Sequence, residues 1–75
     1  MTRDDVVRKA NQIADFFRPY PETEAVDGVA GHIRQFWDPR MRADLARYLA
    51  EDDSGFSSVA LQGARMVVDE DTARA

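Results

Sequence analysis

Apolar residues recur at the spacing of an α-helix along most of this chain, and prolines interrupt the pattern at two places. Spacings of three and four residues place side chains on one face of a helix, where they can be buried together. The first such face comprises Val6, Ala10, Ile13 and Phe17. The segment Arg18–Pro21, of sequence RPYP, must end this helix because two prolines cannot continue its hydrogen bonds.

Two more helices follow the first interruption. The second is predicted from about Glu22 to Phe36, and its apolar face comprises Val26, Ala30, Ile33 and Trp37. Asp38-Pro39 then predicts a new start, because Asp is a favoured N-cap and Pro suits the first helical position. The third helix is predicted to run to about Glu51, and it buries Met41, Leu45, Tyr48 and Leu49.

The last third of the chain has a weaker helical pattern. After the polar loop Glu51–Gly55, Ser57 or Ser58 is predicted to cap a fourth helix that extends through Val68. No segment alternates as a strand does. We therefore expect an all-α fold, a small bundle of three firm helices plus a weaker C-terminal helix, in a single domain over residues 1–68. Residues 69–75 are predicted to be a disordered acidic tail.

The composition excludes several classes of protein. A chain of 75 residues without cysteine and with one histidine offers neither disulfides nor a thiolate or histidine-rich metal site. The net charge of −4 argues against nucleic acid as a partner. No apolar run approaches the ~20 residues of a membrane span, and the N-terminus is not a signal peptide. We expect a soluble cytoplasmic protein whose small core, worth roughly 3–5 kcal/mol, favours a partner protein.

Catalytic chemistry has little support in the sequence. The carboxylates fall at helix ends and in the tail, where water would surround them, whereas acid–base catalysis needs carboxylates in differing environments. There is no glycine-rich phosphate loop, and the single His32 is expected to be a partly exposed helical residue. We therefore predict that the chain is not an enzyme and holds no cofactor or metal.

The most unusual stretch is Phe36–Arg42, of sequence FWDPRMR. One interpretation is a structural corner between two helices, with Trp37 in the core and the arginines in water. The other is a partner surface, because consecutive aromatics point about 100° apart and one core face cannot easily accept both. Arg40 and Arg42 also lie near a helix start, where the positive end of the dipole disfavours cations. The predicted partner-binding residues are Phe36, Trp37, Arg40 and Arg42.

Two stretches resemble a known family. ANQIADFF at residues 10–17, and HIRQFWDPRMRADL at residues 32–45 with the preceding Val29-Ala30-Gly31, are similar to the delta subunit of NAD-dependent formate dehydrogenases. The resemblance covers roughly Val6 to Leu49. It implies a small non-catalytic subunit of a soluble multi-subunit enzyme, whose large alpha subunit holds the molybdenum cofactor and iron–sulfur clusters. The flavin and NAD site would belong to another subunit, and no catalytic residue is carried over to this chain.

Two hypotheses follow from the resemblance and the Phe36–Arg42 stretch. The first is an accessory subunit that docks on the large catalytic subunit and supports assembly or stability of the complex. The alternative is a transient assembly chaperone or a freestanding helical adaptor. If the chain is an accessory subunit, it is expected to form a weak homodimer when isolated at high concentration, because exposed aromatic surface favours self-association.

Overall fold

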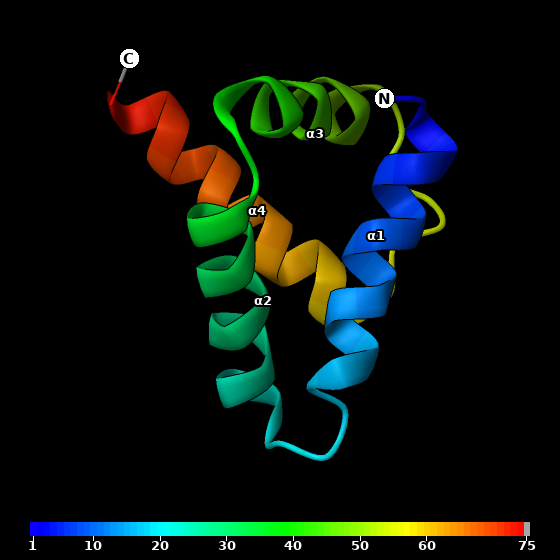
Figure 1. Ribbon diagram of the computed structural model, residues 1–75, viewed down its shortest axis with the longest axis vertical. Coiled ribbons are helices and arrows are strands. Elements are labelled where there is room, and N and C mark those ends of the chain that lie inside the picture. The colour runs from blue at the N-terminus through cyan, green and yellow to red at the C-terminus, as the bar shows by residue number, and fades with distance from the viewer. Residues whose placement is uncertain (75) are drawn as a thin grey trace.

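The computed structural model describes residues 1–74 and consists of four α-helices (Figure 1). Their bounds are α1 Arg3–Phe16, α2 Glu22–Phe36, α3 Pro39–Glu51 and α4 Ser58–Arg74. No strand occurs within the described residues. The all-α prediction is confirmed, and α1 and α2 end close to the residues at which the prolines predicted interruptions.

Side-chain caps explain where three of the helices begin. The Thr2 hydroxyl accepts a hydrogen bond from the backbone N–H of Asp5 at 3.2 Å, at the start of α1. The Asp38 carboxylate accepts one from the N–H of Met41 at 2.8 Å, at the start of α3. At the start of α4 the Ser57 hydroxyl accepts from the N–H of Ala60 at 3.3 Å. Each cap satisfies a backbone donor that the helix itself leaves unpaired.

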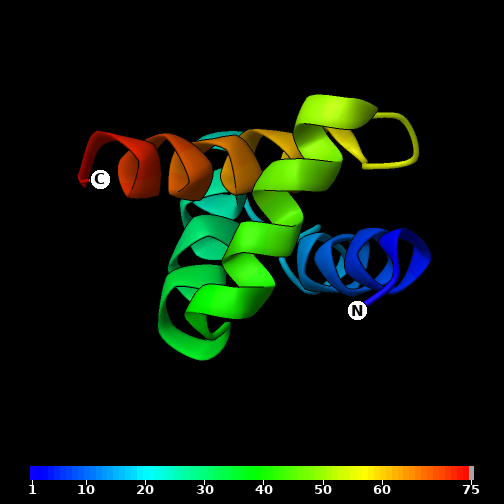
Figure 2. The same ribbon diagram turned by 90° about the horizontal axis from the view of Figure 1, so that it is seen from above.

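The helices enclose one core, with α4 at its centre. Figure 1 shows α1 and α2 running in opposite directions, α3 lying across their far ends, and α4 passing diagonally behind them. Seen from above, α3 crosses over the others and the two chain ends lie on opposite sides (Figure 2). α4 contacts all three other helices, and most extensively α2. The largest fully buried side chains are Ile33, Leu45, Val6, Val29 and Val67.

Two glycines permit close approach between segments. A Cβ at Gly63 would lie 2.6 Å from Cγ1 of Val29 and 3.1 Å from a backbone oxygen, so α4 crosses α2 where it has no side chain. Gly28 has the same role toward α1, because a Cβ there would lie 2.5 Å from the ring of Phe17. Gly31, by contrast, has nothing within 4 Å of such an atom. Close approach therefore explains Gly28, and Gly31 is merely tolerated.

Asn11 connects α1 to the loop that precedes α4. Its side-chain amide donates to the carbonyl oxygen of Gly55 at 2.9 Å and accepts from the N–H of Ser57 at 2.8 Å. One side chain thus pairs with both a backbone acceptor and a backbone donor of the loop. An amide suits this role because it carries an NH2 donor and an oxygen acceptor. This asparagine belongs to the ANQIADFF stretch, so one polar residue of that stretch is explained by folding.

The prediction for residues 69–75 requires a correction. α4 does not end at Val68 but continues to Arg74, so residues 69–74 are helical, and Ala75 lies outside the described residues. The cause is long-range. Glu70 and Asp71 each form an ion pair with an arginine of another helix, and these pairs hold the last turns of α4 against α2 and α3. Residues 69–74 are polar and have no apolar helical face, so their sequence alone does not predict these ion pairs.

Candidate partner-binding surface

Two phenylalanines at the ends of different helices stand largely in solvent. Phe16 is the last residue of α1 and is 69% exposed, while Phe36 is the last residue of α2 and is 65% exposed. Their neighbours in sequence behave differently: Phe17 packs against the core, and Trp37 belongs to it with 6% exposure. Each aromatic pair therefore divides its two rings between the interior and the surface, as a rotation of about 100° per residue requires.

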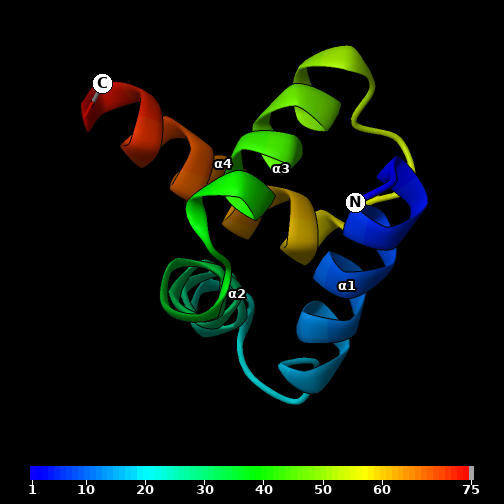
Figure 3. The same cartoon turned by 45° about the horizontal axis from the view of Figure 1, so that its top comes forward.

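An open groove of about 530 Å³ lies between α1, α2 and the start of α3, and we call it the aromatic groove. Its apolar lining comprises Ile13, Phe16, Phe17, Phe36, Trp37 and Met41. The polar lining residues are Lys9, Gln12 and His32. In Figure 3, α1 and α2 lie on opposite sides of the view, and α3 begins next to the end of α2. Residues of both stretches that carry the family resemblance line this groove.

His32 lies at the edge of the aromatic groove. Its ring centroid is 4.7 Å from that of Phe36, with the two planes tilted by 41°. The residue is exposed, in agreement with its prediction as a helical surface residue. Aromatic pairs at this separation attract one another and restrict the orientation of both rings. His32 therefore helps to hold the exposed Phe36 in place.

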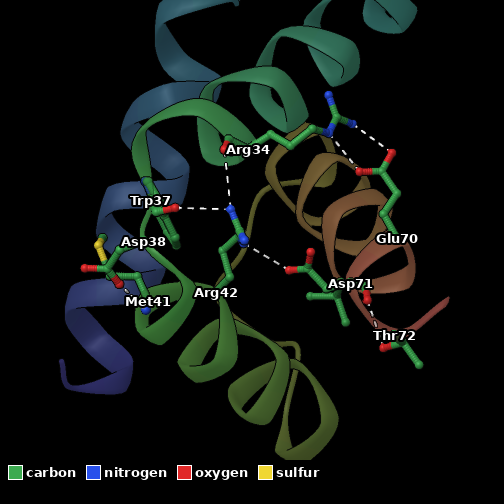
Figure 4. A network of polar contacts seen from close by, with 9 residues as sticks. Arg34, Trp37, Asp38, Met41, Arg42, Glu70, Asp71 and Thr72 are labelled. Carbon is green, nitrogen blue, oxygen red and sulfur yellow. Dashed lines mark hydrogen bonds and ion pairs between the residues drawn. The ribbon is translucent and has the colours of Figure 1, made fainter. Parts of the chain in front are cut away.

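Arg42 makes contacts within the fold that its position in the sequence does not predict. Its Nε donates to the Asp71 carboxylate at 3.1 Å, and its Nη1 donates to the carbonyl oxygens of Arg34 and Trp37 at 3.4 and 3.3 Å (Figure 4). These carbonyls lie at the C-terminal end of α2, the negative end of its dipole. These contacts offset the unfavourable helix start, and they make Arg42 a link between α2, α3 and α4.

Arg40 differs from Arg42 although both follow Pro39. It is exposed, and its side chain makes no hydrogen bond or ion pair within residues 1–74. Of the four residues predicted to bind a partner, Phe36 and Arg40 are exposed, Trp37 lines the groove from the core, and Arg42 is engaged within the fold.

A second ion pair lies beside Arg42. Arg34 on α2 donates from two nitrogens to both carboxylate oxygens of Glu70, at 2.8 and 2.9 Å (Figure 4). This two-bond contact raises the pKa of Arg34 and lowers the pKa of Glu70, because the charged form of each partner receives hydrogen bonds. The sequence analysis missed this pair, since its members are 36 positions apart.

Other kinds of site find no support in the described part of the chain. Within residues 1–74 no group of three or more His, Asp or Glu side chains is placed to hold a metal ion. None of the four helices is both long and apolar enough to cross a membrane. The most developed feature of the surface is therefore the aromatic groove.

The fold and this groove define a small all-α protein with a concave aromatic surface. Such surfaces on small domains commonly mark contact with other proteins. A model of the family described as NADH-dependent formate dehydrogenase delta subunit, FdsD, matches residues 5–64. The chain therefore belongs to this family of formate dehydrogenase subunits. Neither the curated proteins nor the solved structures contained a match.

The family match confirms the resemblance and extends it. It contains both stretches that suggested the family, and it continues beyond Leu49 into the first half of α4. All residues of the aromatic groove fall within it. Glu70 and Asp71, which pair with Arg34 and Arg42, lie outside it. The family name describes a subunit, so membership implies association with other subunits of a formate dehydrogenase complex.

Proposed function

We propose that this chain is a non-catalytic accessory subunit of a soluble, cytoplasmic formate dehydrogenase that uses molybdenum, flavin and NAD. It docks on the large catalytic subunit through the aromatic groove and supports assembly or stability of the complex. The observation that carries the proposal is the pair of phenylalanines, Phe16 and Phe36, exposed on the two sides of one groove. Membership in the delta subunit family supports it independently.

The energetics favour docking through these two rings. Burying a phenylalanine side chain stabilises a complex by roughly 1.5–3 kcal/mol relative to leaving it in water. Phe16 and Phe36 lose little conformational freedom on binding, because each already packs against a neighbouring ring, Phe17 at 5.0 Å and His32 at 4.7 Å between centroids. Rigid aromatic anchors of this kind dominate the affinity of many protein–protein interfaces.

The four predicted residues have distinct parts in this proposal. Phe36 packs against the partner, and the exposed Arg40 contacts it by charge. Trp37 forms part of the surface on which the partner rests, because it lines the groove while remaining in the core. Arg42 acts indirectly, since it holds the α2–α3 corner in place through its contacts with Asp71 and Trp37.

The test is co-purification of tagged variants with the other subunits of the complex. Phe36→Ala should weaken association by about 2 kcal/mol, roughly thirtyfold, as expected for a central aromatic anchor. Tyr20→Ala is the matched control, because Tyr20 is also an exposed aromatic, at 50%, but does not line the groove. Equal recovery of the complex with both variants would show that the groove is not the docking site.

The same purification separates an accessory subunit from a transient assembly chaperone. A subunit remains at fixed stoichiometry in the active enzyme through successive columns, whereas a chaperone is present only with immature complexes. Failure of the wild-type chain to associate with any formate dehydrogenase subunit would refute both and leave a freestanding adaptor.

The isolated chain should also self-associate weakly through the aromatic groove. A symmetric contact between two grooves would bury Phe16 and Phe36 but would bring Lys9 of both copies, which repel one another, to one interface without lining carboxylates. Because salt screens this repulsion, the homodimer should become stronger as ionic strength rises. Sedimentation equilibrium at low and high salt measures the effect, and a monomer at every concentration would argue against the dimer.

A further inference from the structure

The charge of the aromatic groove differs from that of the whole chain. The chain carries 14 acidic and 10 basic residues, for a net charge of −4. No carboxylate lines the groove, whose ionisable residues are Lys9 on the α1 side and His32 on the α2 side. Both are exposed, so the Lys9 ammonium and an imidazole N–H of His32 are available to a bound partner. The groove is therefore an apolar surface with one cation at its edge and no lining carboxylate, on an acidic protein.

The form of the groove suits a helix. It lies between two helices, α1 and α2, and its volume of about 530 Å³ falls among pockets that accept a few side chains. An amphipathic helix can lay its apolar face into such a groove, with anchors spaced three or four residues apart. Phe16 and Phe36 would then contact the two flanks of the inserted helix.

A second copy of this chain fits the groove less well. The apolar faces of its own helices are already committed to the core, so the surface it can offer is its own groove. A groove-to-groove contact brings Lys9 of both copies to one interface with no lining carboxylate, and like charges in contact disfavour association. A partner with acidic residues beside its apolar face avoids this repulsion and gains attraction instead.

We propose that the aromatic groove binds an amphipathic helix of a partner subunit, with acidic residues flanking the apolar anchors. This inference rests on the proposed docking function and adds the chemistry of the segment that docks. The carboxylates of the partner helix face Lys9 and His32, while its apolar anchors lie between Phe16 and Phe36. The electrostatic contribution gives orientation and association rate as well as affinity.

Two synthetic helical peptides test the proposal directly on the isolated chain. Both carry leucines at positions i, i+4 and i+7, and they differ only in having glutamate or lysine beside this stripe. Trp37 is the only tryptophan of the chain and lines the groove, so its fluorescence reports occupancy. The glutamate peptide should bind about fivefold more tightly, because it exchanges repulsion for attraction at the exposed Lys9 and can accept a hydrogen bond from His32. Its affinity should fall as salt is added.

Variants of two adjacent cations supply the control. Lys9→Glu should remove the preference for the glutamate peptide, since it reverses a charge that lines the groove. Arg8→Glu causes the same change in net charge, but Arg8 is outside the groove and pairs with Asp5 at 3.0 Å. It should leave both affinities within about twofold of wild type, because the Arg8 guanidinium is directed to Asp5 and does not line the groove. Melting curves establish that both variants remain folded.

Several outcomes would overturn the proposal. Equal binding of the two peptides, affinity independent of salt, or equal effects of Lys9→Glu and Arg8→Glu would each show that charge does not select the occupant. Binding of neither peptide, with sedimentation showing a dimer of the chain, would make a second copy the occupant. Loss of the intact complex with Phe36→Ala but not with Lys9→Glu would refute the acidic partner and leave the docking function standing.

Discussion

Arg42 and Asp71 join the start of α3 to the last turns of α4, with 3.1 Å between Nε and a carboxylate oxygen. The same guanidinium donates to the carbonyl of Trp37 at the end of α2. One side chain thus connects three helices in a corner that is only partly exposed to water, since the Arg42 side chain is 20% exposed. Screening by solvent is correspondingly reduced, so this pair stabilises the fold more than most surface pairs do.

Reversal of Arg42 should therefore destabilise the isolated domain. Arg42→Glu places a carboxylate opposite Asp71 and beside backbone carbonyls, at a cost of about 1–2 kcal/mol. For a domain of this size the thermal midpoint should fall by about 4–8 °C per kcal/mol. Arg40→Glu is the control, two positions away and exposed, and it should leave the midpoint unchanged or slightly raised at a helix N-terminus. If both variants melt together with the wild type, the corner contacts contribute nothing to stability.

The Arg34–Glu70 pair predicts acid sensitivity at the end of α4. The pKa of Glu70 in the folded state is below its ordinary value of 4.5, chiefly because Arg34 donates hydrogen bonds to the carboxylate. The unfolded chain therefore binds the proton first as pH falls. The contribution of the pair is present above about pH 4.5 and is lost as pH falls through the folded pKa.

Amide hydrogen exchange along residues 69–74 measures this effect. Protection should decrease as the solution is acidified, and Glu70→Gln should lower protection near neutral pH while flattening its dependence on acid. Asp69→Asn is the control, because Asp69 is an exposed neighbouring carboxyl without an ion pair in the described chain. An acid profile of Glu70→Gln identical to that of wild type would mean that this pair does not hold the helix end.

Two consecutive aromatics should have opposite effects when truncated. Trp37 belongs to the core, so Trp37→Ala should destabilise the isolated domain by roughly 3–5 kcal/mol, through lost burial and the cavity left behind. Phe36→Ala should barely change stability, because the ring is 65% exposed. Thermal or urea unfolding of each variant measures the difference. A large loss of stability for Phe36→Ala would place that ring in the fold instead of on the partner surface.

The crossing of α4 over α2 predicts opposite effects for two glycine substitutions. Gly63→Ala places a methyl group 2.6 Å from Val29 and near backbone, where little can move, and should destabilise the protein by about 1–3 kcal/mol. Gly31→Ala has open space and replaces glycine within a helix, so it should stabilise by up to about 1 kcal/mol. The unfolding midpoints of the two variants, compared with that of the wild type, measure these changes in stability. Stabilisation by Gly63→Ala would mean that the helices can separate at little cost.

Much of the fold could be predicted because its signals are local. The prolines at 19, 21 and 39 end or start helices whatever the tertiary contacts are. Asp38 caps α3 through the backbone N–H of Met41, three residues along the chain. The rotation of about 100° between consecutive helical residues likewise separates Phe36 from Trp37 without reference to other helices. Fold class, the first three helices and the exposure of Phe36 follow from such short-range rules.

Other features depended on contacts between distant segments. Residues 69–74 contain no apolar face, and they became helical turns because Glu70 and Asp71 meet arginines 36 and 29 positions away. For the same reason the helix start of Arg42 gives no sign that carbonyls of α2 and the Asp71 carboxylate bind its guanidinium. Phe16 and Phe36 are each exposed through local helical geometry, but only the packing of α1 against α2 brings them to one groove. Sequence spacing determines which way a side chain points from its own helix. Ion pairs and the shape of the surface depend on the distances between helices, and only the tertiary structure sets those distances.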